Sequence, residues 1–493
     1  MKFISTRGVS VVDSAAHAIV KGLAEDGGLF VPQSFPDFSN QLKDMLNMSY
    51  PERAARVIHS FLTEYDFDDL LSACNKAYSL FEDGEPAPLV KLDDKFFIME
   101  LFHGPTLAFK DVALTLLPYL LRKGADITGV KDNILILTAT SGDTGKAALE
   151  GFKNQQGVGI IVFYPSQGVS DMQKLQMQTQ EGDNVLVMGV EGNFDDCQTS
   201  VKNIFSSKEM FAKLKDKNTI LSSANSMNFG RLVPQVSYYF SAYCDLVNCG
   251  EIELGDKVDF VVPTGNFGNI LAGYYAKQMG LPVGKLVCAS NMNNVLTEFF
   301  TDGTYDANRE FFKTMSPSMD ILISSNLERL IFEMSNRDSK VTAERMLQLK
   351  KNGKYTITDS EKQSLQKEFY GIYTEEDDCL DTISNVFDEY GYLADPHTAV
   401  AINGYFGYKK YSSSDNVSVI LSTASPYKFT QAVLKAINGK TIKDAFVCAE
   451  NLMEESAMPI PEQITSLKTK ERRFTDVVDK NKTSEVVLNF ASK

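Results

Sequence analysis

The sequence has few of the side chains that bind metals and few that form disulfides. It contains four histidines, too few for a histidine-rich metal site, so no metal is expected. Its seven cysteines are scattered, and no two of them form a CxxC pair. An odd number of scattered cysteines argues against both a disulfide framework and a structural zinc site.

The sequence also lacks a basic character and long apolar stretches. Its formal net charge is −15 at pH 7, whereas a protein that binds nucleic-acid phosphates needs a basic face. No apolar run is long enough to cross a bilayer, and the polar residues 1–7 lack the apolar region of a secretory signal. We therefore expect a cytoplasmic protein without nucleic-acid or membrane partners, in which a local site binds any anionic substrate.

What is present is an alternation of apolar strands and helices from about residue 111 onwards. Short apolar runs predict buried strands at residues 133–137, 158–163, 185–190, 258–262, 285–289 and 417–421. Helical patterns occupy residues 144–152, 170–179, 194–205, 229–246, 269–279, 396–405 and 429–437. Continuous apolar strands separated by helices are typical of parallel sheets that helices cover on both faces. Because the strands form two series, we predict an α/β fold with two lobes and a cleft between them.

The remaining segments complete a predicted domain division. Residues 1–90 form a mostly helical N-terminal domain, and residues 111–231 form a small α/β lobe. Residues 91–110 and 232–493 form a large lobe. Within the large lobe, residues from about 301 to 390 interrupt the α/β rhythm, and we interpret them as a helical, solvated insertion without evident chemistry.

One lysine stands out because of its surroundings. Lys110 lies at the end of the segment FHGPTLAFKD (102–111), and an apolar, helix-favouring run, residues 112–117, follows it. A helix N-terminus repels a cation, and burial disfavours a charged amine, so both effects favour the neutral form. A neutral, nucleophilic amine is what a Schiff base with an aldehyde cofactor requires. On this stretch alone, a surface lysine at the start of an amphipathic helix is an equal alternative.

Two loops follow predicted strands, where parallel α/β proteins bind ligands. Residues 138–145 (TATSGDTG) place hydroxyls and glycines before a helix, which suits a substrate carboxylate. An ordinary helix cap by Ser141 or Asp143 is the alternative. Residues 263–269 (PTGNFGN) have the composition of a phosphate-binding loop but match neither GxGxxG nor a P-loop. A small phosphorylated cofactor is therefore favoured over a nucleotide.

Two further stretches carry polar groups at the ends of elements. Residues 422–426 (STASP) follow a strand, and a hydroxyl there is able to hydrogen-bond a heteroaromatic nitrogen, with a simple turn as the alternative. Residues 222–231 (SSANSMNFGR) surround Arg231 with amides and hydroxyls at the start of a helix. Arginine is a forked donor that suits phosphate or carboxylate, although a surface ion pair is the alternative.

Taken together, these motifs resemble those of the threonine synthases, which are pyridoxal-phosphate (PLP) enzymes of fold type II, the tryptophan-synthase-β fold. In chain order the motifs are DGGLFVP (26–32), FHGPTLAFKD (102–111), TSGDTG (140–145), NSMNFGR (225–231), PTGNFGN (263–269) and DPHTAVA (395–401). They span nearly the whole chain, and the insertion and tail resemble the longer bacterial and fungal subgroup. The resemblance implies a lyase of threonine biosynthesis. It would convert O-phospho-L-homoserine and water into L-threonine and phosphate by γ-elimination and β-hydration.

The resemblance also assigns roles to single residues. Lys110 would carry PLP as a Schiff base and then act as acid and base. Thr423 would face the pyridine nitrogen, and Asp143 stands where many fold-type-II relatives have an asparagine near the 3′-oxygen of PLP. The phosphate of PLP would be held by Gly265, Asn266, Phe267, Gly268 and Asn269. The substrate carboxylate would be held by Ser141, Gly142 and Thr144, and its phosphate by Asn225, Ser226 and Arg231.

Two other interpretations stay open at this point. The first is a threonine-synthase-like phospholyase on the same scaffold, which would release α-ketobutyrate from the same substrate. The second is a non-catalytic protein that keeps the PLP fold, although the presence of Lys110, the phosphate loop and Thr423 argues against it. The implied partner is a small-molecule substrate, the oligomeric state is open between monomer and dimer, and we interpret His103 as structural.

Overall fold

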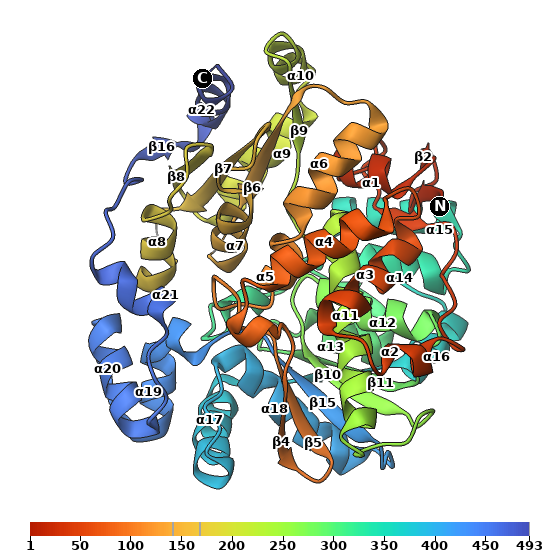
Figure 1. The fold of residues 1–493 in the computed structure, drawn as a ribbon, viewed down its shortest axis with the longest axis vertical. Helices are drawn as coiled ribbons and strands as arrows, with labels where there is room; N and C mark the ends of the chain where they lie inside the picture. Colours follow the sequence, from red (N-terminus) through yellow and green to blue (C-terminus); the bar gives the residue numbers. More distant parts are fainter. Residues whose placement is uncertain (141, 167–168, 493) are drawn as a thin grey trace.

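Two sheets organise the molecule (Figure 1), which is a computed structural model that describes residues 1–140, 142–166 and 169–492. The larger sheet has the strand order β14-β11-β10-β15-β5-β4 and is parallel except for the edge pair β4–β5. Its strands are β4 (Leu89–Asp93), β5 (Phe96–Glu100), β10 (Val258–Pro263), β11 (Val283–Ser290), β14 (Phe369–Tyr373) and β15 (Val417–Ser422). The smaller sheet, β16-β8-β7-β6-β9, is parallel throughout. Its strands are β6 (Asn133–Ala139), β7 (Val158–Pro165), β8 (Val185–Glu191), β9 (Thr219–Ser222) and β16 (Val477–Asp479).

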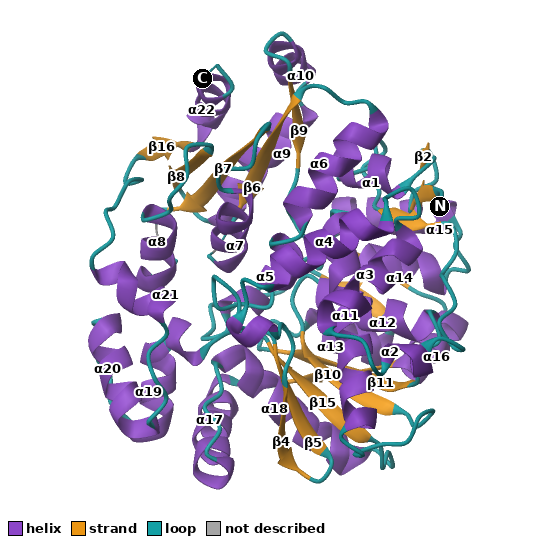
Figure 2. Cartoon of the chain, in the orientation of Figure 1, coloured by secondary structure: helices purple, strands orange, loops and turns teal. Residues whose placement is uncertain are grey.

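Helices cover both sheets, as Figure 2 shows. Helices α12 (Gly268–Gln278) and α18 (Pro396–Tyr411) pack on the larger sheet, and α7 (Asp143–Phe152) and α9 (Phe194–Ser206) pack on the smaller one. Every residue of β10 is buried, as expected of a parallel strand with both faces covered. The two-lobed α/β fold with mostly parallel sheets is therefore confirmed.

The six predicted strands are present as β6, β7, β8, β10, β11 and β15. The predicted helices correspond to α7, α8 (Asp171–Gln178), α9, α11 (Phe229–Asn248), α12, α18 and α19 (Thr430–Asn438). The strands that the pattern did not predict include β4, β14 and β16, which lie at sheet edges. Edge strands face solvent on more sides, so their sequences carry a weaker apolar signal.

The N-terminal segment combines helices with a small antiparallel sheet, ordered β2-β1-β3. Its elements are β1 (Phe3–Ser5), β2 (Val11–Val12), α1 (Ala15–Lys21), β3 (Phe30–Pro32), α2 (Leu42–Met45), α3 (Tyr50–Phe61) and α4 (Phe67–Tyr78). A capping box starts α3, because Ser49 and Glu52 satisfy each other's backbone N–H groups. The buried face of α3 packs on α11, and α1 packs on α6 (Leu117–Thr128).

The insertion adds helices and an edge strand to the larger lobe. Its helical part comprises α13 (Val295–Asp302), α14 (Leu327–Met334), α15 (Ser339–Asn352), α16 (Asp359–Glu368) and α17 (Glu376–Tyr390). A short antiparallel pair, β12 (Thr304–Asp306) with β13 (Lys354–Thr356), lies among them. Strand β14 then pairs in parallel with β11. The insertion therefore completes one edge of the larger sheet.

The C-terminal tail passes from the larger lobe to the smaller sheet (Figure 1). It contains α20 (Ala445–Ser456), α21 (Glu462–Thr465), β16 and α22 (Thr483–Phe490). Strand β16 pairs with β8, and α22 packs on α9 and on α10 (Lys208–Lys215). The end of the chain thus lies with the smaller sheet, although we had assigned it to the large lobe. The pairing covers the exposed backbone edge of β8. Within the described residues, no helix is both long and apolar enough to cross a membrane.

Helix α7 packs closely against the short helix α5 (Asp111–Leu114) at Gly151, and α5 directly follows Lys110. A Cβ atom at Gly151 would lie 2.1 Å from the carbonyl oxygen of Leu114. We expect Gly151→Ala to lower the free energy of unfolding by about 1 to 3 kcal/mol, because backbone cannot move aside cheaply. In an open helix the same change would stabilise by about 1 kcal/mol. Denaturant titration measures the difference.

Gly407→Ala in α18 is the matched control for this prediction. There the nearest atom to the added Cβ is the tip of the Ile372 side chain, which can rotate away. We expect the control to be close to neutral. Equal stability of both variants would show that α7 and α5 are not in close contact.

Candidate active site

Lys110 lies at the end of a segment that runs beside the end of β15. The Phe109 N–H donates to the Thr423 carbonyl oxygen at 2.9 Å, and Ala108 forms an antiparallel bridge with Ala424. This pairing aligns the segment before α5 begins at Asp111. The Lys110 side chain is buried, with 10% of its surface exposed. The sequence prediction of a buried lysine before a helix is therefore confirmed.

The Lys110 amine has weak polar partners and charged neighbours of both signs. Its Nζ lies 3.4 Å from Asp143 Oδ2 and 3.3 Å from Ser318 Oγ. Burial lowers the pKa of Lys110, and the positive charges of Lys428 and Arg231 lower it further, while Asp143 acts in the opposite direction. The result is a lowered pKa, which favours an amine that attacks carbonyls and accepts protons.

Asp143 is the first residue of α7 and makes two short contacts. Its Oδ1 lies 2.7 Å from Lys428 Nζ, and it accepts a hydrogen bond of 2.8 Å from Gln173 Nε2. Burial opposes its ionisation, but Lys428 and Lys110 together hold the pKa of Asp143 well below its usual range. Asp143 is therefore a carboxylate at neutral pH and is closer to Lys428 than to Lys110.

The hydroxyl-rich loop before α7 is held by one threonine. Thr140 Oγ1 accepts from the N–H groups of Gly142 at 3.0 Å and Gly145 at 2.9 Å. Gly142 has a φ of 150° and offers no side chain to cap the helix. Thr144 is half-buried, and Ser141 lies outside the described residues. The assignment of this loop to a substrate carboxylate stays a prediction.

The PTGNFGN loop leads into α12 without a side chain that caps the helix. The residue before the helix is Phe267, with a φ of 63°, whose side chain cannot accept a hydrogen bond from the first N–H groups. Helix N-terminal N–H groups without internal partners bind anions. Asn269 Nδ2 is buried and has no hydrogen-bond partner among the described residues. A Cβ at Gly268 would meet no atom closer than 3.6 Å. These features suit a phosphate at this helix start.

Arg231, near the start of α11, is buried and has unused donor capacity. One of its nitrogens donates to the Ala224 carbonyl oxygen at 2.9 Å, but Nε has no partner among the described residues. Burial lowers the pKa of Arg231 to about 10, so it stays a cation at neutral pH. Ser226 and Asn266 are linked through Ser325, which contacts them at 3.3 Å and 3.2 Å. The loop before α11 and the PTGNFGN loop therefore adjoin each other.

Several residues at the site escaped prediction. Ser318, in the turn Pro317–Met319 of the insertion, contacts both Lys110 and Asp143. Lys428 lies in the turn after β15, and Gln173 lies on α8. The STASP stretch, in which we predicted a ligand contact, ends two residues before Lys428. This closeness in the sequence is the one signal that could have pointed to Lys428. The insertion thus contributes a side chain that contacts the site, which its sequence did not indicate.

His397, from the DPHTAVA motif, holds the Ser318 turn in place. Its Nε2 accepts from the Ser318 backbone N–H at 3.1 Å, and its Nδ1 lies 2.6 Å from Asp395 Oδ2. Because Nε2 accepts, the ring carries its proton on Nδ1, which donates to the carboxylate. The motif therefore contributes to the site by fixing a loop rather than by contacting Lys110.

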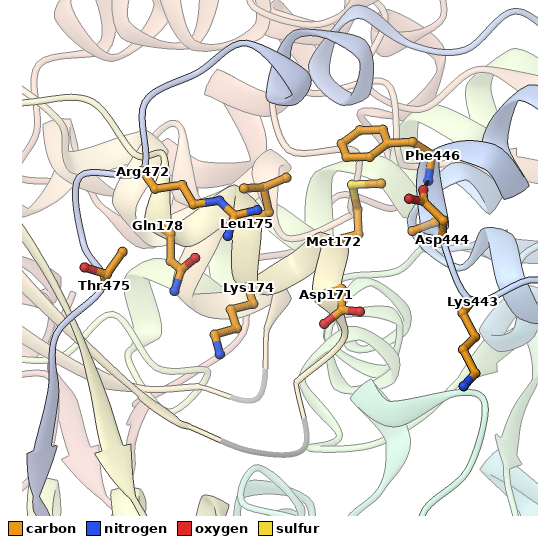
Figure 3. Close-up of a pocket in the computed structure, with 11 residues that line it drawn as sticks. Asp171, Met172, Lys174, Leu175, Gln178, Lys443, Asp444, Phe446, Arg472 and Thr475 are labelled. Carbon is orange, nitrogen blue, oxygen red and sulfur yellow. Dashed lines mark hydrogen bonds between the residues drawn. The ribbon is translucent and has the colours of Figure 1, made fainter.

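A separate hollow of about 410 Å³ lies beside α8 (Figure 3). On that helix Asp171, Lys174, Leu175 and Gln178 line it at the spacing of one helical face, together with Met172. Gln173, the α8 residue that contacts Asp143, does not line it. The rest of its wall consists of residues before and within α20 and residues of the tail. The hollow and the Lys110 site therefore use different faces of one helix.

Known families account for almost the whole chain. A family model described as "Threonine synthase N terminus" matches residues 2–78, and one described as "Pyridoxal-phosphate dependent enzyme" matches residues 80–423. A third, "Threonine synthase, C-terminal", matches residues 398–487. The second match alone covers more than half of the chain and includes Lys110, Asp143 and the PTGNFGN loop.

Individual relatives agree with these family matches. The threonine synthase of Pseudomonas aeruginosa is 39% identical over 88% of this chain and 90% of its own length. The human protein "Threonine synthase-like 1" is 41% identical over 90% of this chain, which spans only 61% of that relative's length. The solved structure of PLP-bound threonine synthase from Brucella melitensis is 37% identical, with a TM-score of 0.88 and full coverage of both chains.

His103 precedes the Lys110 segment and makes the stability of this region depend on pH. Its two ring nitrogens each lie 2.8 Å from a carboxylate, Glu82 and Glu100. Burial works against its protonation, but the two carboxylates outweigh burial and raise the pKa of His103 above 6.5. A raised folded-state pKa means that the stabilisation is complete below the unfolded pKa and is lost as pH rises through the folded one.

We therefore expect the thermal midpoint of the wild type to fall more steeply than that of His103→Gln as pH rises above about 6.5, the ordinary pKa of histidine. Differential scanning calorimetry in matched buffers measures both. His59→Gln is the control, because the His59 ring contacts the Tyr65 carbonyl oxygen instead of a carboxylate. If His103→Gln kept the wild-type slope, the paired carboxylates would not bind the proton.

Proposed function

Because the chain belongs to the threonine synthase family of PLP-dependent enzymes, we propose that it converts O-phospho-L-homoserine and water into L-threonine and phosphate. The observation that carries the proposal is the buried amine of Lys110, whose pKa is lowered, in one site with an uncapped helix start and the buried Arg231. These are the groups that an aldehyde cofactor with a phosphate, and a second phosphate on the substrate, require.

The residues present fit PLP. Lys110 offers the amine, and the unpartnered Asn269 Nδ2 and the open space at Gly268 suit a phosphate at the start of α12. Thr423, at the strand end beside Lys110, is the candidate partner of the pyridine nitrogen. The phosphate group would contact Gly265, Asn266, Phe267, Gly268 and Asn269. When bound, PLP supplies an electron sink that makes protons on the substrate's carbons easier to remove.

The remaining groups suit the two anionic ends of the substrate. Gly142 and Thr144, together with Ser141, are proposed to bind the carboxylate at the start of α7. Asn225, Ser226 and Arg231 are proposed to bind the phosphate, for which the unpartnered Arg231 Nε supplies a charge-assisted donor. Since Ser226 and Asn266 share Ser325 as a neighbour, the substrate phosphate would lie close to the cofactor phosphate.

The protein's own contribution to the reaction is proton transfer and positioning. Lys110 Nζ, whose lowered pKa favours the neutral amine, is the proposed base that takes the Cα proton and later returns one to Cα. The bond between Cγ and the phosphate oxygen breaks, and Cγ gains a proton to become a methyl group. Cβ loses one proton and forms a bond to the oxygen of water, whose second proton leaves with the phosphate. Overall one water is consumed and one phosphate released, so a phosphate ester becomes a hydroxyl on the neighbouring carbon.

The thiol inventory supports a reducing compartment, and we propose the cytoplasm. The seven cysteines are free thiols, and Cys249 is the exposed one. Disulfides are typical of oxidising compartments, whereas free buried thiols persist where glutathione keeps them reduced.

We expect Lys110→Ala to lower the rates of phosphate and threonine formation by about 10³-fold or more, because it removes both the cofactor's attachment point and the base. Phosphate and threonine are measured together on purified protein with O-phosphohomoserine. Equal yields in the wild type support the proposal. Phosphate with α-ketobutyrate in place of threonine would make the protein a phospholyase, and no turnover despite a visible cofactor band would mean that the substrate is wrong.

We expect Arg231→Gln to raise KM for O-phosphohomoserine by about 10- to 100-fold, the worth of hydrogen bonds to a charged group. Inhibition by inorganic phosphate should weaken in parallel. Arg231→Lys is the matched variant: it keeps the charge but loses the forked donor, so its loss should be smaller. An unchanged KM and unchanged phosphate inhibition in Arg231→Gln would remove Arg231 from the substrate site.

A further inference from the structure

Lys428 is a buried lysine for which the proposed reaction has no assigned use. It ends the turn Pro426–Lys428 after β15, and its side chain has no exposed surface. Its Nζ lies 2.7 Å from Asp143 Oδ1 and donates to the Thr106 carbonyl oxygen at 2.9 Å. A buried ammonium is tolerated only with such partners. Asp143 is the nearest carboxylate that compensates its charge.

Asp143 divides its two oxygens unequally between two lysines. Oδ1 takes the short contact with Lys428 and the hydrogen bond from Gln173. Oδ2 faces Lys110 Nζ at 3.4 Å and Ser318 Oγ at 3.3 Å, both at the long end of hydrogen bonding. An ion pair with Lys110 at the shorter distance would stabilise the ammonium form of that lysine. In the structure the short ion pair is with Lys428, so Asp143 stabilises the ammonium of Lys428 instead.

The charged side chains that act on Lys110 come from three parts of the fold. Asp143 of α7, Lys428 of the turn after β15 and Arg231 of α11 act on it. Asp111 is occupied by the N–H and hydroxyl of Thr106, at 2.8 Å and 2.6 Å. The uncharged neighbours are Ser318 and the Phe109 ring, 5.3 Å from Nζ, with His397 behind the Ser318 backbone. Lys110 and Lys428 thus share Asp143, at 3.4 Å and 2.7 Å, and Arg231 adds a third positive charge.

We infer that Lys428 is a positioning residue that pairs with Asp143 and so leaves the Lys110 nitrogen only the long contact with that carboxylate. The inference rests on the proposed function only in that Lys110 is the reactive amine.

The test is a pH titration of the visible absorption band of the cofactor-loaded, full-length protein. Lys428→Met removes the competing cation, so we expect the midpoint for the Lys110 nitrogen to rise by about one pH unit or more. Lys428→Arg keeps the charge and should shift the midpoint much less. Asp143→Asn should lower it. The pair Asp143→Asn with Lys428→Met should return it close to the wild type, since both charges are gone.

Lys146→Met is the matched control. Lys146 is also largely buried on α7, but it pairs with Glu150 at 3.1 Å and Gln180 at 2.6 Å. The variant Lys146→Met should leave the midpoint unchanged. It therefore separates the structural effect of removing a buried lysine from the effect of removing a charge next to Asp143. An unchanged or lowered midpoint in Lys428→Met, or an equal shift in Lys146→Met, would overturn the inference. If Lys428→Met did not fold, Asp143→Asn decides, and an unchanged midpoint there overturns it.

A second readout does not depend on the reaction. Competitive acetylation of the full-length chain stripped of cofactor, followed by mass spectrometry, gives the pKa of the Lys110 amine itself. We expect this pKa to rise in Lys428→Met. If it rises while the wild type makes no threonine, the proposed function fails and the inference stands. If the wild type makes threonine and Lys428→Met moves neither the band nor the amine, the inference fails alone.

Discussion

The burial of lysine amines is the constraint on which this site depends. A buried ammonium is unfavourable unless an anion and hydrogen bonds compensate its charge. Lys110, Lys428 and Arg231 are all buried, and Asp143 is the carboxylate that lies within 4 Å of both lysines. Lys428 has the short contact with this carboxylate and Lys110 the long one. The proposed reactivity of Lys110 thus depends on its burial and on how this carboxylate is shared between the two lysines.

The fold creates this arrangement by ending strands of two sheets at one place. Lys110 follows β5, the PTGNFGN loop follows β10 and Lys428 follows β15, all in the larger sheet. Asp143 follows β6 of the smaller sheet. The contact between Asp143 and the two lysines therefore joins the lobes, so the charge state of Lys110 depends on how the lobes meet. Ser318 contacts the same amine, and His397 holds the Ser318 turn through a hydrogen bond from the Ser318 backbone N–H.

Much of this could be predicted from the sequence, because it rests on local patterns. Buried parallel strands are continuous apolar runs, and β6, β10 and β15 were predictable for that reason. The loops after them carry glycines and hydroxyls, which marked the regions of Asp143 and Asn269 as ligand sites.

The long-range pairs were not predictable. Nothing near Lys428 in the sequence indicates that its partner is Asp143. Ser318 was not predicted because the acidic composition of the insertion suggested a solvated segment. Strand β16 was missed because it is three residues long, and its strand character comes from pairing with β8. The resemblance to a family supplied roles for single residues, but it did not supply the sharing of Asp143 between two lysines.

We propose that Lys110, and not the more deeply buried Lys428, carries the cofactor. The most direct test is to reduce the purified, cofactor-loaded protein with borohydride, digest it and map the pyridoxyl group by mass spectrometry. The account predicts one modified peptide, with the group on Lys110. A pyridoxyl group on Lys428 or on another lysine, or none on any peptide, would contradict it.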